Sequence, residues 1–186
     1  MNKMKFSVSI ASAFIALFAS WIDKANAEDK SGFEYAGDVL QILIPATGYA
    51  TTFYLDDKEG RNQFYKSFFT NLGITYALKY TIDKKRPENN GAHSFPSGHT
   101  SAAFQGAAFI HKRYGWEYGI PAYLGAAYVG WSRVEGESDK HDALDVIVGA
   151  GIGVLTSFYF TEPYNGFTIT PVVTDEYTGI FLIKRW

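Results

Sequence analysis

Three short segments of this chain hold residues that could together bind and transfer an anionic group. They supply two histidines, three lysine or arginine side chains, and a carboxylate four residues after one of the histidines. Covalent transfer of a phosphoryl group through histidine needs this combination, because an imidazole attacks phosphorus while fixed cations neutralise the charged oxygens. The segments run from Lys79 to Pro87, from Pro96 to His99 and from Ser132 to Asp145.

His141 and Asp145 are the candidate nucleophile and its partner. They are four residues apart at the start of an apolar stretch, and on a helix this spacing places both side chains on one face. The carboxylate can accept the proton of one ring nitrogen, which leaves the other nitrogen with a lone pair in a fixed tautomer. Asp142 is adjacent in sequence and would face elsewhere. The alternative is that the pair only caps a helix.

The run Pro96-Ser97-Gly98-His99 predicts the start of a helix that binds phosphate. Backbone N–H groups at a helix start bind anions, and Gly98 lets the backbone approach closely. Ser97 can cap the helix or donate its hydroxyl to an oxygen. His99 would then lie beside the bound group. The alternative is an ordinary turn and cap without a ligand.

In this order, Lys-x6-Arg-Pro, Pro-Ser-Gly-His and Ser-Arg…His-x3-Asp resemble the motifs of the type-2 phosphatidic acid phosphatase superfamily. That group includes lipid phosphate phosphatases, bacterial class A acid phosphatases and vanadium haloperoxidases. The family usually has five residues between the arginine and the histidine of the third motif, whereas Val134 to Lys140 makes seven here. A loop longer by two residues costs little free energy, so the match holds.

The resemblance implies a role for each matched residue. His141 is the nucleophile that forms a phosphohistidine, His99 is the general acid that protonates the leaving alkoxide, and Asp145 orients His141. For Lys84 and Lys85 we expect solvated side chains. The residues implied to bind phosphate are Lys79, Arg86, Ser97, Gly98 and Arg133.

No metal and no cofactor are expected at this site. Histidines and carboxylates could cluster there, but no HExxH or similar ligand spacing occurs and the chain has no cysteine. Three converging cations would also repel a divalent metal. The haloperoxidase branch, which would hold vanadate in the same place, consists of much larger chains.

The function implied is that of a metal-independent phosphatase which removes a terminal phosphate from a lipid-linked substrate in the cell envelope. One alternative is a soluble periplasmic acid phosphatase of broad specificity. An alternative of another class is a non-catalytic envelope protein that binds through an old anion pocket, which only the longer loop of the third motif favours. Phosphate release by the purified protein would exclude that last alternative.

The length and the charge of the chain indicate one exported domain. Residues 1–27 resemble a secretory signal peptide or signal anchor, with two early lysines, an apolar stretch and Ala25-Asn26-Ala27 at its end. Residues 28–186 then form a single phosphatase domain. The first 27 residues carry three lysines and one aspartate, so their removal changes the formal net charge from −2 to −4. This balance argues against nucleic acid as a partner.

The fold class predicted is all-α, an antiparallel bundle of about five helices, or six with the N-terminal segment. Connections are short and polar, and glycine and alanine recur where helices would approach closely. The segment Phe167 to Trp186 alternates β-branched and aromatic residues around a turn, which predicts a short C-terminal β-hairpin. The helices expected are Gly37–Leu55, Gln63–Tyr80, Thr100–Tyr114, Ile120–Trp131 and Asp142–Phe160.

Helix parity places the three motifs at one end of such a bundle. Lys58, Arg61, Lys112 and Arg113 fall at the opposite end, a positive-inside bias that would turn the site toward the periplasm. Membrane association is expected, although only the last helix approaches the length of a span and the mean hydropathy is −0.10. The many aromatic residues suit an interfacial belt or a soluble core.

Overall fold

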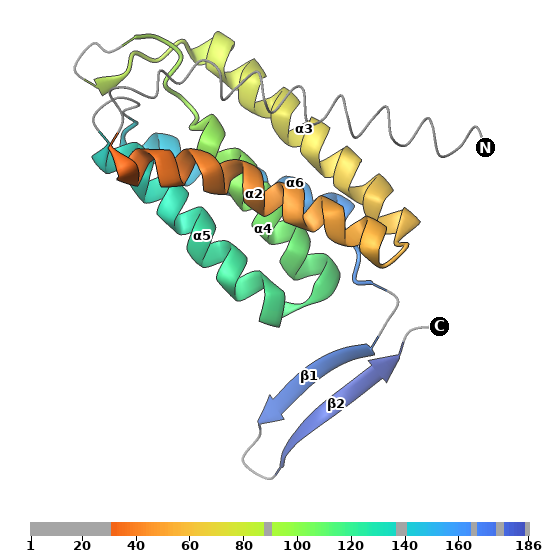
Figure 1. The fold of residues 1–186 in the computed structure, drawn as a ribbon. Helices are drawn as coiled ribbons and strands as arrows, with labels where there is room; N and C mark the ends of the chain where they lie inside the picture. Colours follow the sequence, from red (N-terminus) through yellow and green to blue (C-terminus); the bar gives the residue numbers. More distant parts are fainter. Residues whose placement is uncertain (1–30, 88–90, 137–140, 165–166, 174–176, 185–186) are drawn as a thin grey trace.

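The computed structural model describes residues 31–87, 91–136, 141–164, 167–173 and 177–184. Within these ranges the chain forms five helices and one hairpin (Figure 1). The predicted signal segment, residues 1–27, lies outside the described residues and stays a prediction. The elements are α2 (Gly32–Tyr54), α3 (Lys58–Ile82), α4 (Gly98–Tyr114), α5 (Trp116–Glu135), α6 (Ala143–Phe160), β1 (Phe167–Val173) and β2 (Thr178–Lys184).

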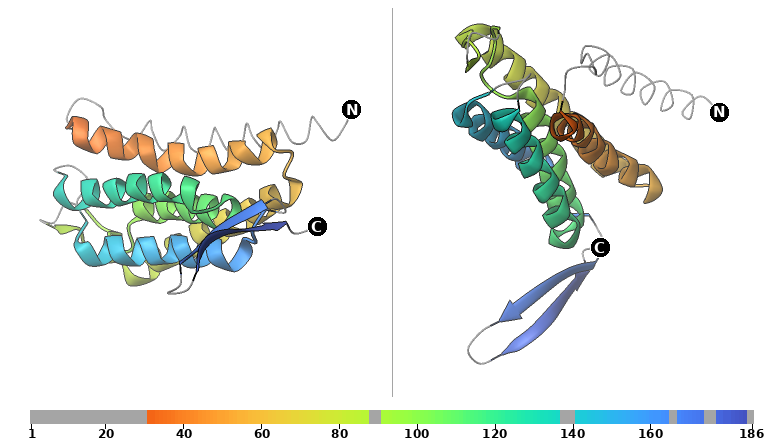
Figure 2. Two further views of the ribbon diagram at one scale, coloured as in Figure 1. Left: turned by 90° about the horizontal axis from the view of Figure 1, so that it is seen from below. Right: turned by 60° about the vertical axis from the view of Figure 1, so that its left-hand side comes forward.

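The predicted all-α bundle is confirmed, and consecutive helices run in opposite directions (Figures 1 and 2). Helices α2 and α3 each begin five residues before their expected starts. Ser31 caps α2, since its hydroxyl accepts a hydrogen bond from the backbone N–H of Glu34 at 3.4 Å. The extra turn of α2 carries Glu34 into the bundle, where its side chain is buried.

Helix α4 is the central element and packs against all four other helices. Its contact with α6 is close because glycines of α6 face it. A Cβ atom on Gly149 would lie 2.5 Å from the carbonyl oxygen of Ser97, so only glycine fits there. This approach fixes the start of α4 against the first turns of α6.

Hydrogen bonds between buried polar side chains join α3 and α4. The Oγ of Ser101 donates to Oδ1 of Asn71 at 2.7 Å and lies 2.8 Å from Oγ1 of Thr75. Farther along, Nε2 of Gln105 donates to Oγ of Ser67 at 2.9 Å. All five residues are buried. Hydrogen bonds between small polar residues therefore hold these helices together.

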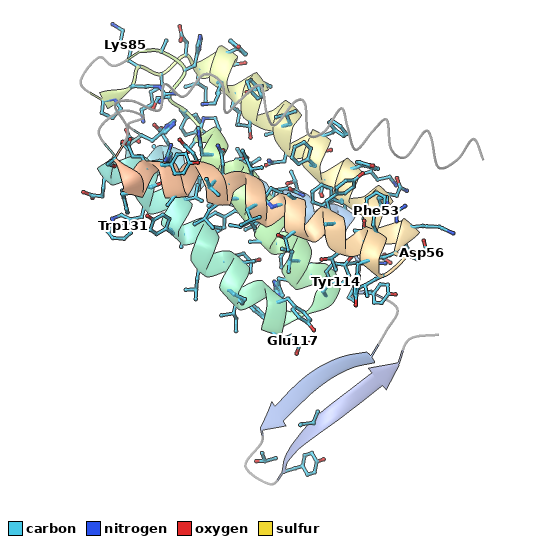
Figure 3. All side chains as sticks on the ribbon, in the orientation of Figure 1. Phe53, Asp56, Lys85, Tyr114, Glu117 and Trp131 are labelled. Carbon is cyan, nitrogen blue, oxygen red and sulfur yellow. The ribbon has the colours of Figure 1, made fainter. Side chains whose placement is uncertain are left out.

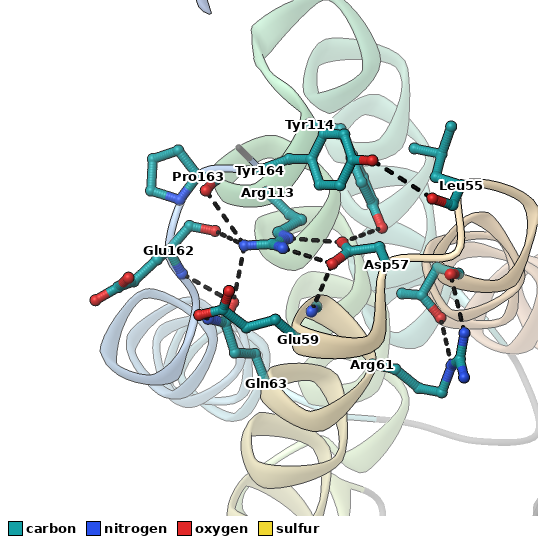
Figure 4. A network of polar contacts seen from close by, with 12 residues as sticks. Leu55, Asp57, Glu59, Arg61, Gln63, Arg113, Tyr114, Glu162, Pro163 and Tyr164 are labelled. Atoms are coloured by element: carbon teal, nitrogen blue, oxygen red, sulfur yellow. Dashed lines mark hydrogen bonds and ion pairs between the residues drawn. The ribbon is translucent and has the colours of Figure 1, made fainter. Parts of the chain in front are cut away.

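Arg113 and Asp57 form a buried ion pair at the other end of the bundle (Figure 4). Nε of Arg113 donates to Oδ2 of Asp57 at 2.7 Å, and Nη1 donates to the backbone oxygen of Glu162 at 2.8 Å. Arg113 thus lies at the end opposite the three motifs, as parity predicts, but its charge is paired with Asp57. Its guanidinium joins the start of α3, the end of α4 and the segment after α6.

The predicted C-terminal hairpin is present as strands β1 and β2. They pair antiparallel, with Phe167 opposite Lys184 and Val173 opposite Thr178. Figures 1 and 2 show the hairpin projecting from the bundle after the end of α6. It lies at the end of the molecule that carries the Arg113–Asp57 pair, away from the three motifs.

Candidate functional site

Five helix ends meet at one end of the bundle, as parity predicts. Helices α2, α4 and α6 begin there, and α3 and α5 end there (Figure 1). The three motifs lie on these ends and on the loops that connect them. The positive ends of three helix dipoles therefore point toward the same region, which favours binding of an anion.

His141 and Asp145 lie side by side, although His141 precedes Asp142, the N-cap of α6, and therefore lies outside the helix expected to carry both. Nδ1 of His141 is 3.3 Å from Oδ2 of Asp145, and both side chains are buried. Asp142 caps α6, because its Oδ1 accepts the backbone N–H of Asp145 at 3.2 Å. Since the carboxylate faces Nδ1, the proton is held on that nitrogen and the lone pair lies on Nε2. The geometry suits a nucleophile in a fixed tautomer.

Two residues that the sequence analysis did not select complete this carboxylate's surroundings. The hydroxyl of Ser94, itself fully buried, donates to Oδ2 of Asp145 and lies 3.3 Å from Nδ1 of His141. Nζ of Lys84 is 2.7 Å from Oδ1 of Asp145. Both carboxylate oxygens therefore have partners, which holds Asp145 ionised and in one orientation.

The prediction that Lys84 is a solvated cation is wrong. Its side chain is 30% exposed and lies between Asp142 and Asp145. Burial acts to lower the pKa of Lys84, but the hydrogen bonds that it donates to the two carboxylates outweigh this effect, so the pKa is raised. Lys84 therefore stays charged at neutral pH. Lys85, by contrast, is exposed, as expected (Figure 3).

The Pro96–His99 run begins α4, as predicted. Ser97 is the N-cap, and its hydroxyl accepts the backbone N–H of Thr100 at 3.4 Å. Its own backbone N–H donates to the carbonyl oxygen of Asp145 at 2.9 Å. This bond ties the second motif to the third. Ser97 and Gly98 are buried, and the side chain of His99 is partly exposed.

Arg133 lies inside the protein and binds α2. Its side chain has no exposed surface; Nη1 donates to Oδ1 of Asp38 at 2.9 Å, and Nη2 donates to the carbonyl oxygen of Glu34 at 2.9 Å. The same oxygen of Asp38 is 3.3 Å from Nε2 of His99. The backbone N–H of His141 donates to the carbonyl oxygen of Arg133 at 2.8 Å, so the longer loop still returns His141 to Arg133.

Lys79 and Arg86 lie at the same end of the bundle. Lys79 is in the last turn of α3, and Arg86 is in the loop between α3 and α4. Nζ of Lys79 donates to the carbonyl oxygen of His93 at 2.9 Å, which fastens the end of α3 to the loop before α4. The backbone N–H of Arg86 donates to the carbonyl oxygen of Gly91 at 2.9 Å. Short contacts therefore connect four of the predicted residues, His99, Arg133, His141 and Asp145. Lys79 and Arg86 instead hold the adjoining loop.

Asp38, Ser94 and Lys84 are the residues that sequence reasoning missed. A weak signal existed for the first, because Glu34 and Asp38 are four residues apart at the start of an otherwise apolar helix. Ser94 and Lys84 stand beside the motifs without belonging to them. Taken together, the cluster can hold an imidazole nucleophile in one orientation and give a proton to a leaving oxygen.

Comparison with known proteins gives the family of this chain. The model of the PAP2 superfamily matches residues 57–167, which includes all three motifs. The chain is similar to the lipid A 1-phosphatase of Porphyromonas gingivalis, with 39% identity over 111 residues that make up 58% of this chain. It spans only 23% of that relative's length. It is also similar to the lipid A 4'-phosphatase of Helicobacter pylori, with 28% identity over 78% of this chain and 79% of that protein.

The fold also resembles a solved structure. The crystal structure of Aquifex aeolicus LpxE superposes with a TM-score of 0.54, over 68% of this chain and 90% of that one. The sequence identity is 21%, so this likeness concerns the fold alone. The helical bundle is therefore the arrangement expected for the matched motifs.

Proposed function

The chain belongs to the PAP2 superfamily, and from this premise we propose that it is a metal-independent phosphatase that acts on a lipid-linked phosphomonoester through a phosphohistidine. The observation that carries the proposal is the buried His141–Asp145 pair, joined by backbone hydrogen bonds to Arg133 and to the start of α4. Among lipid substrates, a phosphate of lipid A is our first candidate because both named relatives are lipid A phosphatases.

In the proposed reaction, Nε2 of His141 attacks phosphorus. The bond between phosphorus and the leaving oxygen breaks, and protonated His99 gives its proton to that oxygen. Neutral His99 then takes a proton from water, whose oxygen attacks the phosphohistidine. The phosphorus–nitrogen bond breaks, inorganic phosphate leaves, and both histidines return to their starting states. Arg133, Arg86 and Lys79 neutralise the phosphoryl oxygens in this scheme, Ser97 offers its hydroxyl, and Gly98 offers its backbone N–H group.

The distribution of polar and apolar residues supports action at a membrane. Each of the five described helices has a central stretch free of Asp, Glu, Lys and Arg; these are residues 39–50, 67–78, 100–110, 118–132 and 146–160. Within the described residues the interior is largely polar, whereas large apolar side chains face outward. Leu43, Leu124, Ile147 and Leu155 are each more than half exposed. Such an arrangement is favourable when lipid surrounds the helices.

Exposed aromatic residues lie toward both ends of this apolar band. Trp131 (Figure 3) and Tyr35 lie at the site's end. Tyr54, Trp116 and Tyr159 lie at the other end. Tyrosine and tryptophan prefer the two interfaces of a membrane. By length and hydropathy, α6 alone among the described helices passes as a span. The other helices carry polar side chains, which could cross a bilayer only where they face the interior of the bundle.

We further propose that the site faces the periplasm. The support is the predicted signal segment and the lysines at the opposite end of the bundle, Lys58 and Lys112, which suit the cytoplasmic side. Labelling of a single cysteine introduced at Lys58 in intact cells tests this orientation. A membrane-impermeant thiol reagent should fail to label it until the inner membrane is opened.

The experiment that tests the proposed activity is a panel of esters. Purified protein in detergent is given lipid A, phosphatidic acid and p-nitrophenyl phosphate, and released phosphate is measured. We expect the fastest release from a lipid, inhibition by vanadate and no effect of EDTA. Release from only the soluble ester would favour the periplasmic acid phosphatase instead. No release from any ester would favour the non-catalytic binding protein.

Replacement of Lys84 by methionine should lower kcat about 10- to 100-fold, because a small displacement of Asp145 misaligns His141. KM should change little, because Lys84 binds two carboxylates of the protein and is not assigned a contact with the substrate. The matched control is Lys85→Met, which removes an exposed charge next to it. Equal kinetics of the two variants would show that Lys84 does not position Asp145.

A further inference from the structure

Asp38 has a position that the proposed reaction does not explain. It lies on α2, outside residues 57–167 that the family model matches. One of its oxygens, Oδ1, is 2.9 Å from Nη1 of Arg133 and 3.3 Å from Nε2 of His99. In the proposed reaction, Arg133 neutralises the phosphoryl oxygens and His99 protonates the leaving oxygen. A single carboxylate oxygen thus bridges the two, as a phosphoryl oxygen would.

The burial of these residues decides how a substrate can reach Arg133. The side chain of Arg133 has no exposed surface, so an incoming anion can contact it only after a partner has moved. Two partners, the carbonyl oxygen of Glu34 and the hydroxyl of Ser132, are fixed on helices. The side chain of Asp38 is 14% exposed and can rotate, and that of His99 is 20% exposed. Asp38 is therefore the partner best placed to give way.

We propose that Asp38 is a positioning residue whose carboxylate occupies the anion site between turnovers and competes with the phosphoryl group for Arg133 and His99. This inference rests on the proposed function and deepens it. The carboxylate keeps the two side chains facing one another while the site is empty. When a phosphoryl group enters, negative charges repel at short range, which weakens binding of both substrate and product phosphate. Return of Asp38 then assists the release of phosphate.

The test is the Asp38→Asn variant, which removes the charge and keeps the shape. Binding of orthovanadate and of inorganic phosphate to the purified protein is measured by calorimetry, and kcat and KM are measured with the best ester of the panel. We expect the dissociation constants of both anions to fall about tenfold or more, because a like charge has been removed from the site. KM should fall with them, and kcat should fall because phosphate leaves more slowly.

Asp83→Asn is the matched control. Asp83 lies at the same end of the bundle, and its carboxylate is 3.0 Å from His93 and not part of the Arg133 contact. Its φ of 45° is one that asparagine tolerates. Binding of vanadate should change less than twofold in this variant. A general loss of negative charge would instead tighten binding in both variants equally, which would overturn the specific role of Asp38.

A structural role for Asp38 predicts the opposite sign. If the carboxylate only supports Arg133, its loss should weaken anion binding, and unchanged or weaker binding in Asp38→Asn overturns the proposal. Asp38→Ser is measured beside it, since the smaller side chain leaves room for water. Loss of cooperative thermal unfolding in both variants would make Asp38 a structural ion-pair partner and would also overturn it. The binding measurement does not require turnover, so a protein that binds vanadate but releases no phosphate would contradict the proposed function alone.

Discussion

Replacement of His141 by alanine is expected to lower the rate of phosphate release by about 10⁴-fold or more, the order of loss seen when an enzyme is deprived of its nucleophile. The reason is that no other group near the site lies in the same position relative to Asp145, Ser94 and the carbonyl of Arg133. The measurement is phosphate release from the best lipid substrate at saturating concentration. Binding of vanadate should weaken far less than the rate.

The matched control for this prediction is His111→Asn. His111 lies near the end of α4, about 18 Å along the helix from His99 at 1.5 Å per residue. Its ring packs on Trp116 with centroids 3.7 Å apart, so it belongs to the opposite end of the bundle. The rate of this variant should stay within a few-fold of the original. Substantial activity in His141→Ala would exclude His141 as the nucleophile.

Replacement of Asp57 by asparagine is expected to destabilise the protein by about 3–5 kcal/mol, because it leaves the charge of Arg113 buried without its partner. The asparagine can still cap α3, so the variant isolates the ion pair from the cap. The midpoint of thermal unfolding in detergent should fall by about 6–20 °C for a chain of this size. Asp56→Asn is the control: Asp56 is exposed, so the midpoint should hardly move.

The same pair predicts how stability depends on pH. Burial acts to raise the pKa of Asp57, but hydrogen bonds from Arg113 and from the backbone of Gly60 outweigh it, so the pKa is lowered. A carboxyl whose folded pKa lies below its unfolded value of about 3.9 contributes stability above that value. The contribution is lost as pH falls through the folded pKa. Asp57→Asn should therefore flatten the decline in stability below about pH 4, and an unchanged acid profile would contradict this role.

The helices could be predicted from sequence because apolar stretches and caps agree at most of them. α6 begins within one residue of its expected start, since Asp142 is a cap followed directly by apolar residues. α2 begins earlier than expected because Glu34 looks like a solvent-facing charge in the sequence. Its side chain is nevertheless buried, and its carbonyl oxygen accepts a hydrogen bond from Arg133, which is distant along the chain. Local patterns cannot contain that information.

The residues of the candidate site also fall into those that local sequence patterns could predict and those that they could not. Residues inside a motif could be selected, because each segment carries its own spacing and the pair His141–Asp145 is local to the start of α6. Lys84 and Ser94 could not, since their role depends on how the loop before α4 folds onto α6. A lysine is usually solvated, so a prediction from residue type alone fails for Lys84. Whether a lysine is solvated or bound to carboxylates depends on tertiary contacts.

The measurement that tests the central claim most directly is detection of the covalent intermediate. Purified protein is mixed with a lipid substrate labelled with ³²P on its phosphate, stopped in alkali within milliseconds, digested and mapped. The account predicts an alkali-stable, acid-labile label on the peptide that contains His141, formed and lost at rates consistent with turnover. Label on the peptide of His99 instead, or phosphate release without any labelled peptide, would contradict it.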